Sequence, residues 1–292
     1  MAHTAVIEVE DLNVTYGDFA AVSDLSFEVR PGELYALLGT NGAGKTSTLE
    51  VIEGHRRADS GTVRIFGESP QQRRLVRPRM GIMLQESGFS RDLTVHESVG
   101  LIGSLSGRQG DVDGVLEVAG LTPKKETAVS QLSGGEKRRL DFATAVFGSP
   151  ELIILDEPTT GLDIQSRDAL WTAVDRLRED GATVVLTTHY LEEAQQRADR
   201  IGLMHAGELR REGTVSELTR TLPSVITFAL PPGSPEPPIV GALNGAFHVE
   251  TFNLQGDMYR LLDWAHDTGV ELQGLEAGPT RLDDVFRTLG AA

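Results

Sequence analysis

A glycine-rich stretch near the N-terminus carries the residue types that bind nucleotide phosphates. It reads Gly39-Thr-Asn-Gly-Ala-Gly-Lys45-Thr46 and follows the apolar run Leu34–Leu38. Glycines let the backbone turn tightly enough for successive N–H groups to point at phosphate oxygens, and a helix that starts near Lys45 adds the positive end of its dipole. In this P-loop pattern, Lys45 reaches the terminal phosphates and the Thr46 hydroxyl ligates Mg²⁺. The predicted phosphate-binding residues are Gly39, Thr40, Asn41, Gly42, Ala43, Gly44, Lys45, Thr46 and Ser47.

Two adjacent carboxylates follow a second apolar run. The run Leu152–Leu155 leads directly into Asp156 and Glu157. An apolar strand that ends in a carboxylate places Asp156 where it can hold Mg²⁺ through water, as in P-loop ATPases. Glu157 then stands beside the γ-phosphate, where it can orient or deprotonate the attacking water. A solvated acidic turn would explain the pair in isolation, but next to a P-loop the pair predicts nucleotide hydrolysis.

The stretch Leu132-Ser133-Gly134-Gly135-Glu136 offers a second anion cradle at a predicted helix start. Alone, it would be no more than a capped helix. Because it lies between the P-loop and Asp156, it resembles the signature motif of the ABC ATPase family. The resemblance implies that Ser133, Gly134 and Gly135 of one subunit cap the ATP held on the P-loop of another. The partner would be a second copy or a homologous ATPase subunit, in a head-to-tail dimer.

Four further positions match the motifs of this family, in the family's order. Tyr16 occupies the place of the aromatic residue that stacks on adenine, an interaction worth about 1–3 kcal/mol. Gln85 matches the glutamine that ligates Mg²⁺ and senses the membrane partner. His189 matches the switch histidine at the γ-phosphate, and Asp163 matches the loop that crosses to the other subunit. The resemblance thus implies ATP and Mg²⁺ as ligands, Thr46, Gln85 and Asp156 as metal-binding residues, and Glu157, His189 and Lys45 as catalytic residues.

A basic run, Lys137-Arg138-Arg139, follows the signature on the predicted helix Lys137–Phe147. We interpret this run as a solvated helix face. An approach of these side chains to the phosphates is the alternative.

The elements that must position these residues alternate between strands and helices. Continuous apolar runs predict buried parallel strands at Leu34–Leu38, Met80–Leu84, Leu152–Leu155 and Thr183–Thr187. Helical stretches include Thr46–Glu53 and Arg167–Glu179. The alternation predicts an α/β fold with a mostly parallel sheet, which the resemblance specifies as P-loop and RecA-like. An antiparallel β part is expected at the N-terminus, from strands Ala5–Val9 and Ser26–Val29.

The chain is expected to hold two domains. Apolar residues at helical spacing between Leu93 and Val129 predict a helical subdomain over about residues 89–147 of an ABC ATPase domain, residues 1–220. The sequence changes character near Thr221, and a stiff connector, Pro231–Pro238, follows. Residues 221–292 are expected to form a small α+β domain. Its expected elements are strands Val225–Leu230, His248–Phe252 and Val270–Leu275, and helices at Met258–Thr268 and from about Arg281.

Composition excludes several functions. The 292 residues carry a formal net charge of −16 and no cysteine. Non-specific nucleic-acid binding requires positive charge that displaces counterions, so no nucleic-acid partner is expected. Without cysteine there is no disulfide and no thiol chemistry. We expect no export signal, and no apolar run is long enough to span a bilayer. The membrane part of a transport process would therefore be another polypeptide.

A stretch near the C-terminus gives a finer resemblance. Pro279–Phe286 looks like the ending of the daunorubicin/doxorubicin-resistance type of ABC ATPase subunits, which serve bacterial exporters of drugs, lipids or polysaccharides. This implies an ATP-hydrolysing subunit on the cytoplasmic face of the membrane. It would drive a separate polytopic permease through ATP-dependent dimer closure.

Two other functions are the alternatives. A non-transport ABC ATPase acting on DNA ends would carry a long coiled coil between the P-loop and the signature, and one acting on ribosomes would carry two ATPase domains. This chain has neither feature. A nucleotide-gated regulatory module with negligible turnover is opposed by the presence of Glu157 and His189.

Overall fold

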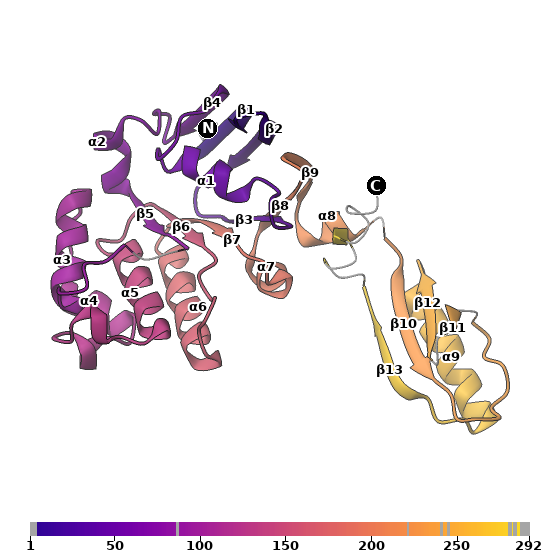
Figure 1. The fold of residues 1–292 in the computed structure, drawn as a ribbon. Helices are drawn as coiled ribbons and strands as arrows, with labels where there is room; N and C mark the ends of the chain where they lie inside the picture. Colours follow the sequence, from indigo (N-terminus) through magenta and orange to yellow (C-terminus); the bar gives the residue numbers. More distant parts are fainter. Residues whose placement is uncertain are drawn as a thin grey trace. The chain divides into compact units, whose positions relative to one another are not determined.

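The computed structural model describes residues 5–85, 88–220, 222–239, 242–243, 246–279, 282, 285 and 286. The chain divides into two compact units, Met1–Thr214 and Val215–Ala292 (Figure 1). The division lies at the start of helix α8 (Val215–Thr219), slightly before the boundary expected after residue 220. Among the helices of the described residues, none is long and apolar enough to cross a membrane.

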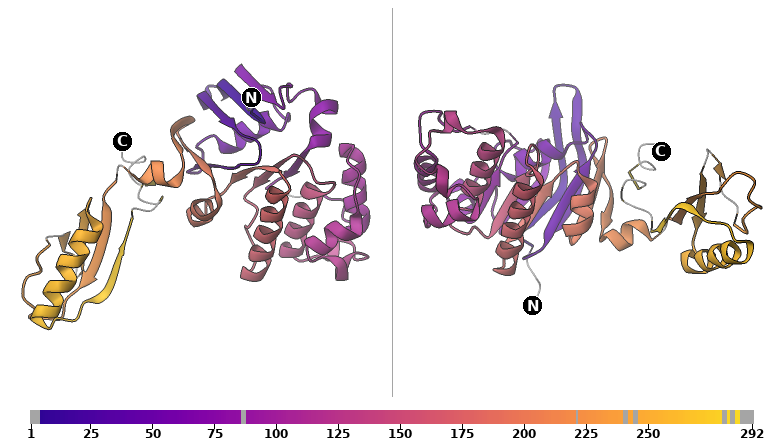
Figure 2. Two further views of the ribbon diagram at one scale, coloured as in Figure 1. Left: turned by 180° about the vertical axis from the view of Figure 1, so that it is seen from behind. Right: turned by 90° about the horizontal axis from the view of Figure 1, so that it is seen from below.

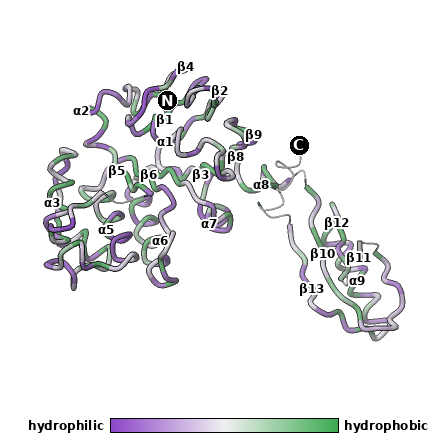
Figure 3. The backbone as a smooth tube through the Cα atoms, in the orientation of Figure 1, coloured by the Kyte–Doolittle hydropathy of each residue, from purple (hydrophilic) through white to green (hydrophobic). Residues whose placement is uncertain are grey.

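A six-stranded sheet with the order β5-β6-β7-β3-β8-β9 forms the centre of the first unit. Its strands are β3 (Leu34–Gly39), β5 (Met80–Met83), β6 (Leu152–Asp156), β7 (Thr183–Thr187), β8 (Arg200–His205) and β9 (Glu208–Gly213). All neighbours are parallel except β8 and β9. Every residue of β6 and β7 is buried, as continuous apolar strands covered on both faces require. Figure 3 shows the apolar stretches (green) at β5 and β6. The predicted fold class is confirmed.

A three-stranded antiparallel sheet, β2-β1-β4, forms the N-terminal β part. Its strands are β1 (Ile7–Tyr16), β2 (Phe19–Val29) and β4 (Ser60–Ile65). The expected strands Ala5–Val9 and Ser26–Val29 cover only the open end of the β1–β2 hairpin. The hairpin continues to the turn after Tyr16, but irregularities in register beyond Val9 break the simple alternation of apolar and polar residues.

Helices cover both faces of the central sheet (Figures 1 and 2). The α-helices described in the first unit are α1 (Lys45–Ile52), α2 (Arg73–Val76), α3 (Val95–Ser106), α4 (Val112–Val118), α5 (Gly134–Val146), α6 (Ile164–Glu179) and α7 (Leu191–Arg197). Helix α1 lies on the side of the antiparallel sheet, whereas α5 and α6 lie on the opposite face (Figure 1). Helices α3, α4 and α5 share an apolar core that includes Val99, Leu116 and Leu140. Helices α3 and α5 each begin with a capping box.

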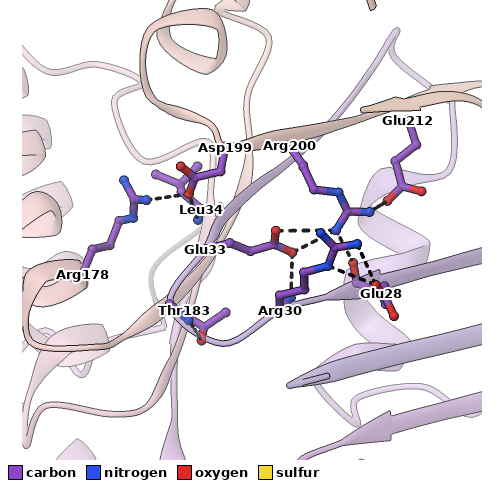
Figure 4. Close-up of polar contacts among 10 residues, drawn as sticks. Glu28, Arg30, Glu33, Leu34, Arg178, Thr183, Asp199, Arg200 and Glu212 are labelled. Carbon is purple, nitrogen blue, oxygen red and sulfur yellow. Dashed lines mark hydrogen bonds and ion pairs between the residues drawn. The ribbon is translucent and has the colours of Figure 1, made fainter. Parts of the chain in front are cut away.

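Ion pairs tie the strands together at the edge where β3 and β8 begin, opposite the P-loop (Figure 4). Arg200 contacts Glu33 Oε1 at 3.1 Å and Glu212 Oε1 at 2.5 Å. The neighbouring Asp199 accepts a hydrogen bond from Arg178 of α6 at 2.5 Å. These contacts fix the starts of β3 and β8 and the end of the antiparallel β9 relative to one another. The P-loop therefore follows a strand whose other end is held by ion pairs.

The second unit is a four-stranded antiparallel sheet, β11-β12-β10-β13, with one helix packed on it. Its elements are β10 (Ser224–Ala229), β11 (Ala242–Leu243), β12 (Phe247–Thr251), α9 (Leu254–Thr268) and β13 (Gln273–Gly278). Phe228, Val249 and Leu261 meet in its core. Strand β13 begins later than the expected Val270, because Gly269 ends α9 in a left-handed conformation (φ 67°) and extended chain follows. The helix expected from about Arg281 lies almost wholly outside the described residues.

Candidate nucleotide site

Four neighbouring parallel strands end at one edge of the central sheet, and predicted site residues follow each of them. Strand β3 leads into the P-loop, β5 into Gln85, β6 ends at Asp156, and β7 leads into His189. The register places Asp156 opposite Thr187, and Thr187 opposite Leu37 of β3. Ligands of α/β sheets bind at the carboxyl ends of the strands. The fold therefore gathers at one edge motifs that are far apart in the sequence.

The P-loop runs from the end of β3 to the first turn of α1. Gly42 and Gly44 have φ values of 80° and 99°, a region that other residues rarely adopt, so these turns require glycine. Lys45 is the first residue of α1, and its Nζ donates to the carbonyl oxygens of Gly39 (2.7 Å) and Thr40 (3.2 Å). The Lys45 ammonium therefore lies over the loop that is predicted to bind the phosphates. Of the remaining loop residues, Asn41 and Thr46 are exposed, Ser47 is half-buried and Ala43 is buried.

Electrostatics connect Lys45 to the two carboxylates at the end of β6. Burial lowers the pKa of Lys45, and the negative charges of Glu157 and Asp156 act in the opposite direction. The carboxylates thus help to keep the Lys45 ammonium charged, which is the form that binds phosphate.

Glu157 and Asp156 are each held by a residue at or after the end of β7. The Thr187 hydroxyl donates to Asp156 Oδ1, within a buried pair. Glu157 Oε2 lies 2.5 Å from His189 Nδ1, and the backbone N–H of His189 also points at it from 3.4 Å. The Glu157 side chain is 15% exposed and that of His189 is 51% exposed. The predicted base and the predicted switch histidine are therefore in direct contact, and the histidine is the more exposed of the two.

Tyr16 lies next to the P-loop helix, although it comes from the β1–β2 hairpin. Its hydroxyl donates to Glu50 Oε2 (2.9 Å) and accepts from the Ser47 hydroxyl (3.4 Å). The guanidinium of Arg56 lies 4.0 Å from the centre of the Tyr16 ring. A base stacked on Tyr16 would therefore use the ring face opposite Arg56.

The signature lies next to the loop that ends in Asp163. Ser133 caps α5 by accepting from Glu136 N (3.2 Å), and Asp163 Oδ1 caps α6 by accepting from Ser166 N (2.7 Å). A Cβ added to Gly135 would lie 3.8 Å from the carbonyl oxygen of Gly161. Each of these two hydrogen bonds is local to the first turn of its helix. Ser133, Gly134 and Asp163 are exposed.

Comparison with known proteins agrees with this arrangement. Residues 22–160 match the family described as "ABC transporter", and residues 224–280 match the one described as "ABC transporter domain-containing protein-like, C-terminal domain". The Nod factor export ATP-binding protein I of Paraburkholderia xenovorans (strain LB400) is 41% identical over 220 residues, which cover 73% of this chain and 72% of that protein. The chain belongs to the ABC transporter family.

Solved structures of ABC cassettes share the fold of this chain. The ATP-binding subunit of an ABC transporter superposes with a TM-score of 0.70 and 27% identity, over 74% of this chain and 92% of that one. A dimeric bacterial ABC transporter cassette superposes with a TM-score of 0.66 and 25% identity, over 71% of this chain and 98% of that one. This chain is thus the ATP-binding ATPase subunit of an ABC transporter.

Two buried residues of this ABC cassette were not anticipated from its sequence. Arg138, expected on a solvated helix face, is 7% exposed and donates to backbone carbonyls near Gln85 and Glu157. The expectation was wrong for Arg138 because α5 is buried at this position and, after the half-buried Arg139, from Leu140 onward. A helix that is buried nearly all round shows no amphipathic pattern. Glu193 of α7 is also buried and accepts from the Thr159 hydroxyl (2.9 Å). Neither position carries a sequence signal other than its nearness to a motif.

Proposed function

We propose that this chain is the ATP-hydrolysing subunit of a bacterial exporter and works at the cytoplasmic face of the membrane as a head-to-tail dimer bound to a separate polytopic permease. The observation that carries the proposal is the Glu157–His189 contact next to the P-loop, on a chain whose signature residues Ser133 and Gly134 are exposed. The relative from Paraburkholderia xenovorans is a Nod factor export ATP-binding protein, which supports export over import.

ATP would bind on the P-loop with its adenine against Tyr16. The N–H groups of the loop and the ammonium of Lys45 would hold the phosphates, because both present positive charge at the start of α1. Mg²⁺ fits the oxygen donors at this edge, namely the exposed Thr46 hydroxyl, the Gln85 side chain and the Asp156 carboxylate oriented by Thr187. When bound, the ion would supply positive charge that offsets the charge on the phosphates.

Glu157 would be the general base. Its carboxylate is directed by His189, which fixes one oxygen and leaves the other to accept a proton from water. His189 is the more exposed partner and would contact the γ-phosphate. It would thus connect the nucleotide directly to the base.

A second subunit would complete each site. Ser133, Gly134 and Gly135 present N–H groups at the start of α5, where a helix favours an anion, but this end is exposed in the single chain. In a head-to-tail pair, the γ-phosphate on one P-loop would meet the signature of the other subunit, with Asp163 at the crossing. Closure of this interface around ATP would be the step that acts on the permease.

The permease would dock beside Gln85 and the helical subdomain. A cavity of about 440 Å³ lies there, lined by apolar side chains of the β5 segment and of α3. Four of these are Met80, Leu84, Leu101 and Ile102. Leu84 and Leu101 are exposed at 42% and 46%, as expected for a surface that a partner covers.

The transported cargo would be a drug, a lipid or a polysaccharide, in keeping with the resemblance of Pro279–Phe286 to the daunorubicin/doxorubicin-resistance type. Half of this stretch lies outside the described residues. The cargo is therefore best identified through the permease.

A trapped complex tests the proposal. The Glu157→Gln variant, purified with ATP from gently solubilised native cells, is expected to bring a polytopic membrane protein in near-stoichiometric amount. Ribosomal or DNA-repair proteins without a membrane partner would instead support a non-transport ABC ATPase. Lys45→Ala, which should not close on ATP, is the matched control and should lose the ATP-dependent part of the complex.

A further inference from the structure

The guanidinium of Arg138 is surrounded by backbone carbonyl groups. Nη1 donates to Leu84 (2.7 Å) and Gln85 (3.2 Å), Nη2 to Asp156 (2.5 Å) and Glu157 (2.6 Å), and Nε to Pro158 (3.3 Å). A guanidinium has five N–H groups, so the number of donors equals the number of acceptors. An ammonium has three donors and an amide has two, and neither can make this set of bonds.

The five carbonyls belong to two segments that are distant in the sequence. Leu84 and Gln85 follow β5, whereas the stretch from Asp156 to Pro158 follows β6. Arg138 itself comes from α5, the helix that begins at the signature. One buried side chain thus joins the signature helix, the Gln85 segment and the segment of the predicted base.

The backbone of Glu157 is in a conformation that needs such support. Its φ of 51° lies in the left-handed region, which is unfavourable for a residue with a side chain. Nη2 of Arg138 binds the carbonyls of Asp156 and Glu157, which belong to the two peptide groups on either side of the Glu157 Cα. Holding both peptide groups fixes the two dihedral angles between them and thereby the direction of the Glu157 side chain.

We infer that Arg138 is a positioning residue for ATP hydrolysis, which holds Glu157 in the conformation that reaches His189 and ties this backbone to the Gln85 segment. The inference rests on the proposed role of Glu157 as the base. Leu84 and Gln85 lie beside the cavity proposed for the permease. A displacement of these two residues would change the hydrogen bonds of Arg138 and, through them, the position of the Glu157 backbone.

Arg108 provides a matched control. It is 8% exposed, against 7% for Arg138, and its guanidinium donates to the carbonyls of Thr144 (2.9 Å), Ala145 (2.7 Å) and Phe147 (3.0 Å). These carbonyls belong to the C-terminal end of α5 and the residue after it. Arg108 is thus a buried guanidinium that stabilises the same helix without touching the segments of Gln85 or Glu157.

The experiment compares Arg138→Lys and Arg138→Gln with Arg108→Lys in the full-length chain. For each protein, kcat and KM for ATP and the urea midpoint of unfolding are measured. Hydrogen–deuterium exchange is followed in peptides around Gln85 and Glu157. We expect both Arg138 variants to lower kcat by about 10-fold to 100-fold with KM changed by less than about threefold, since a misplaced base slows chemistry more than binding. Exchange should rise at the Gln85 and Glu157 peptides together.

Arg108→Lys should lower the urea midpoint while kcat and exchange at those two peptides stay near wild type. Equal losses of kcat in the Arg108 and Arg138 variants would overturn the inference. The Glu157→Gln variant and its combination with Arg138→Lys distinguish a failure of the role of Glu157 as the base from a failure of the role of Arg138 as its positioning residue. If Arg138 acts through Glu157, the combination has the residual rate of Glu157→Gln alone, whereas a further multiplicative loss contradicts the inference. If Glu157→Gln itself keeps turnover, the role of Glu157 fails first.

Discussion

Glu157 Oε2 and His189 Nδ1 are 2.5 Å apart, and the two residues come from the ends of the neighbouring strands β6 and β7. The contact joins residues more than thirty positions apart. It allows the state of the more exposed histidine to affect the less exposed carboxylate directly.

Replacing Glu157 by glutamine should stop turnover and spare binding. The amide keeps the shape of the side chain and a hydrogen bond to His189, but it cannot accept a proton from water. We expect kcat to fall by about 10²–10⁴-fold, with ATP affinity unchanged. Single-turnover hydrolysis and equilibrium binding measure the two quantities, and size-exclusion chromatography with ATP should show an accumulated dimer. A variant that remains monomeric at saturating ATP would contradict the head-to-tail arrangement.

Replacing Lys45 by alanine should abolish productive ATP binding. The variant loses the ammonium that lies over the carbonyls of Gly39 and Thr40, whereas the glycine turns of the loop are untouched. Binding of a fluorescent ATP analogue should be lost, and far-ultraviolet circular dichroism should be unchanged. Undiminished ATPase activity in Lys45→Ala would rule out the P-loop assignment.

Mixing two inactive variants should restore activity. Gly135→Asp places a negative charge at the start of α5, where the helix tolerates it and the added Cβ makes only ordinary van der Waals contact with Gly161 and Leu162, but where it repels the phosphate of a partner subunit. Lys45→Ala inactivates the P-loop. A dimer of the two variants has one site with an intact P-loop and an intact signature. The mixture should therefore hydrolyse ATP although neither variant does, and an inactive mixture would argue that each chain uses its own signature.

Removing the Tyr16 ring should raise KM for ATP. Stacking on an aromatic ring contributes about 1–3 kcal/mol, so Tyr16→Ala should raise KM by about fivefold or more. Tyr16→Phe keeps the ring and should stay near wild type, although it loses the hydroxyl contact with Glu50. Phe19→Ala, at an exposed position across the same turn, controls for damage to the hairpin. An unchanged KM in Tyr16→Ala would make Tyr16 an ordinary surface aromatic.

A buried glutamate at the end of the P-loop helix should make stability depend on pH. Glu53 is 3% exposed, and burial raises its pKa from 4.5, against the opposing effect of a hydrogen bond with His55. Asp156 raises the pKa further and Arg77 lowers it. Because the folded state binds this proton more tightly, the free energy of unfolding falls as pH rises from 4.5 through the raised pKa.

The Glu53→Gln variant removes this titration. Its urea midpoint relative to wild type should therefore increase as pH rises through that interval. The exposed Glu10→Gln variant serves as the control. A difference between Glu53→Gln and wild type that does not change with pH would contradict the prediction.

Some strands were not predicted from the sequence, because pairing with neighbouring strands and not their own hydrophobic pattern decides their structure. Strand β9 pairs with β8 at the far side of the sheet, and β4 joins β1, but β9 and β4 mix charged and apolar residues and show no continuous apolar run. A strand is recognised from sequence when one face or both faces are uniformly buried. Every residue of strand β9 before Gly213 is exposed or half-buried, so pairing with β8 decides its structure.

The sequence by itself determined the nucleotide chemistry. The P-loop, the carboxylates at the end of β6 and the signature are short stretches in which adjacent residues are predicted to act on one ligand, so their spacing is recognised without a fold. The tertiary structure decided how these stretches are connected. Arg138 looked like part of a solvated basic run, and it is instead bonded to five carbonyls of two distant segments. Backbone carbonyls carry no side-chain identity, so a residue that binds only to them leaves no pattern in the sequence, and its partners are known only once the chain is folded.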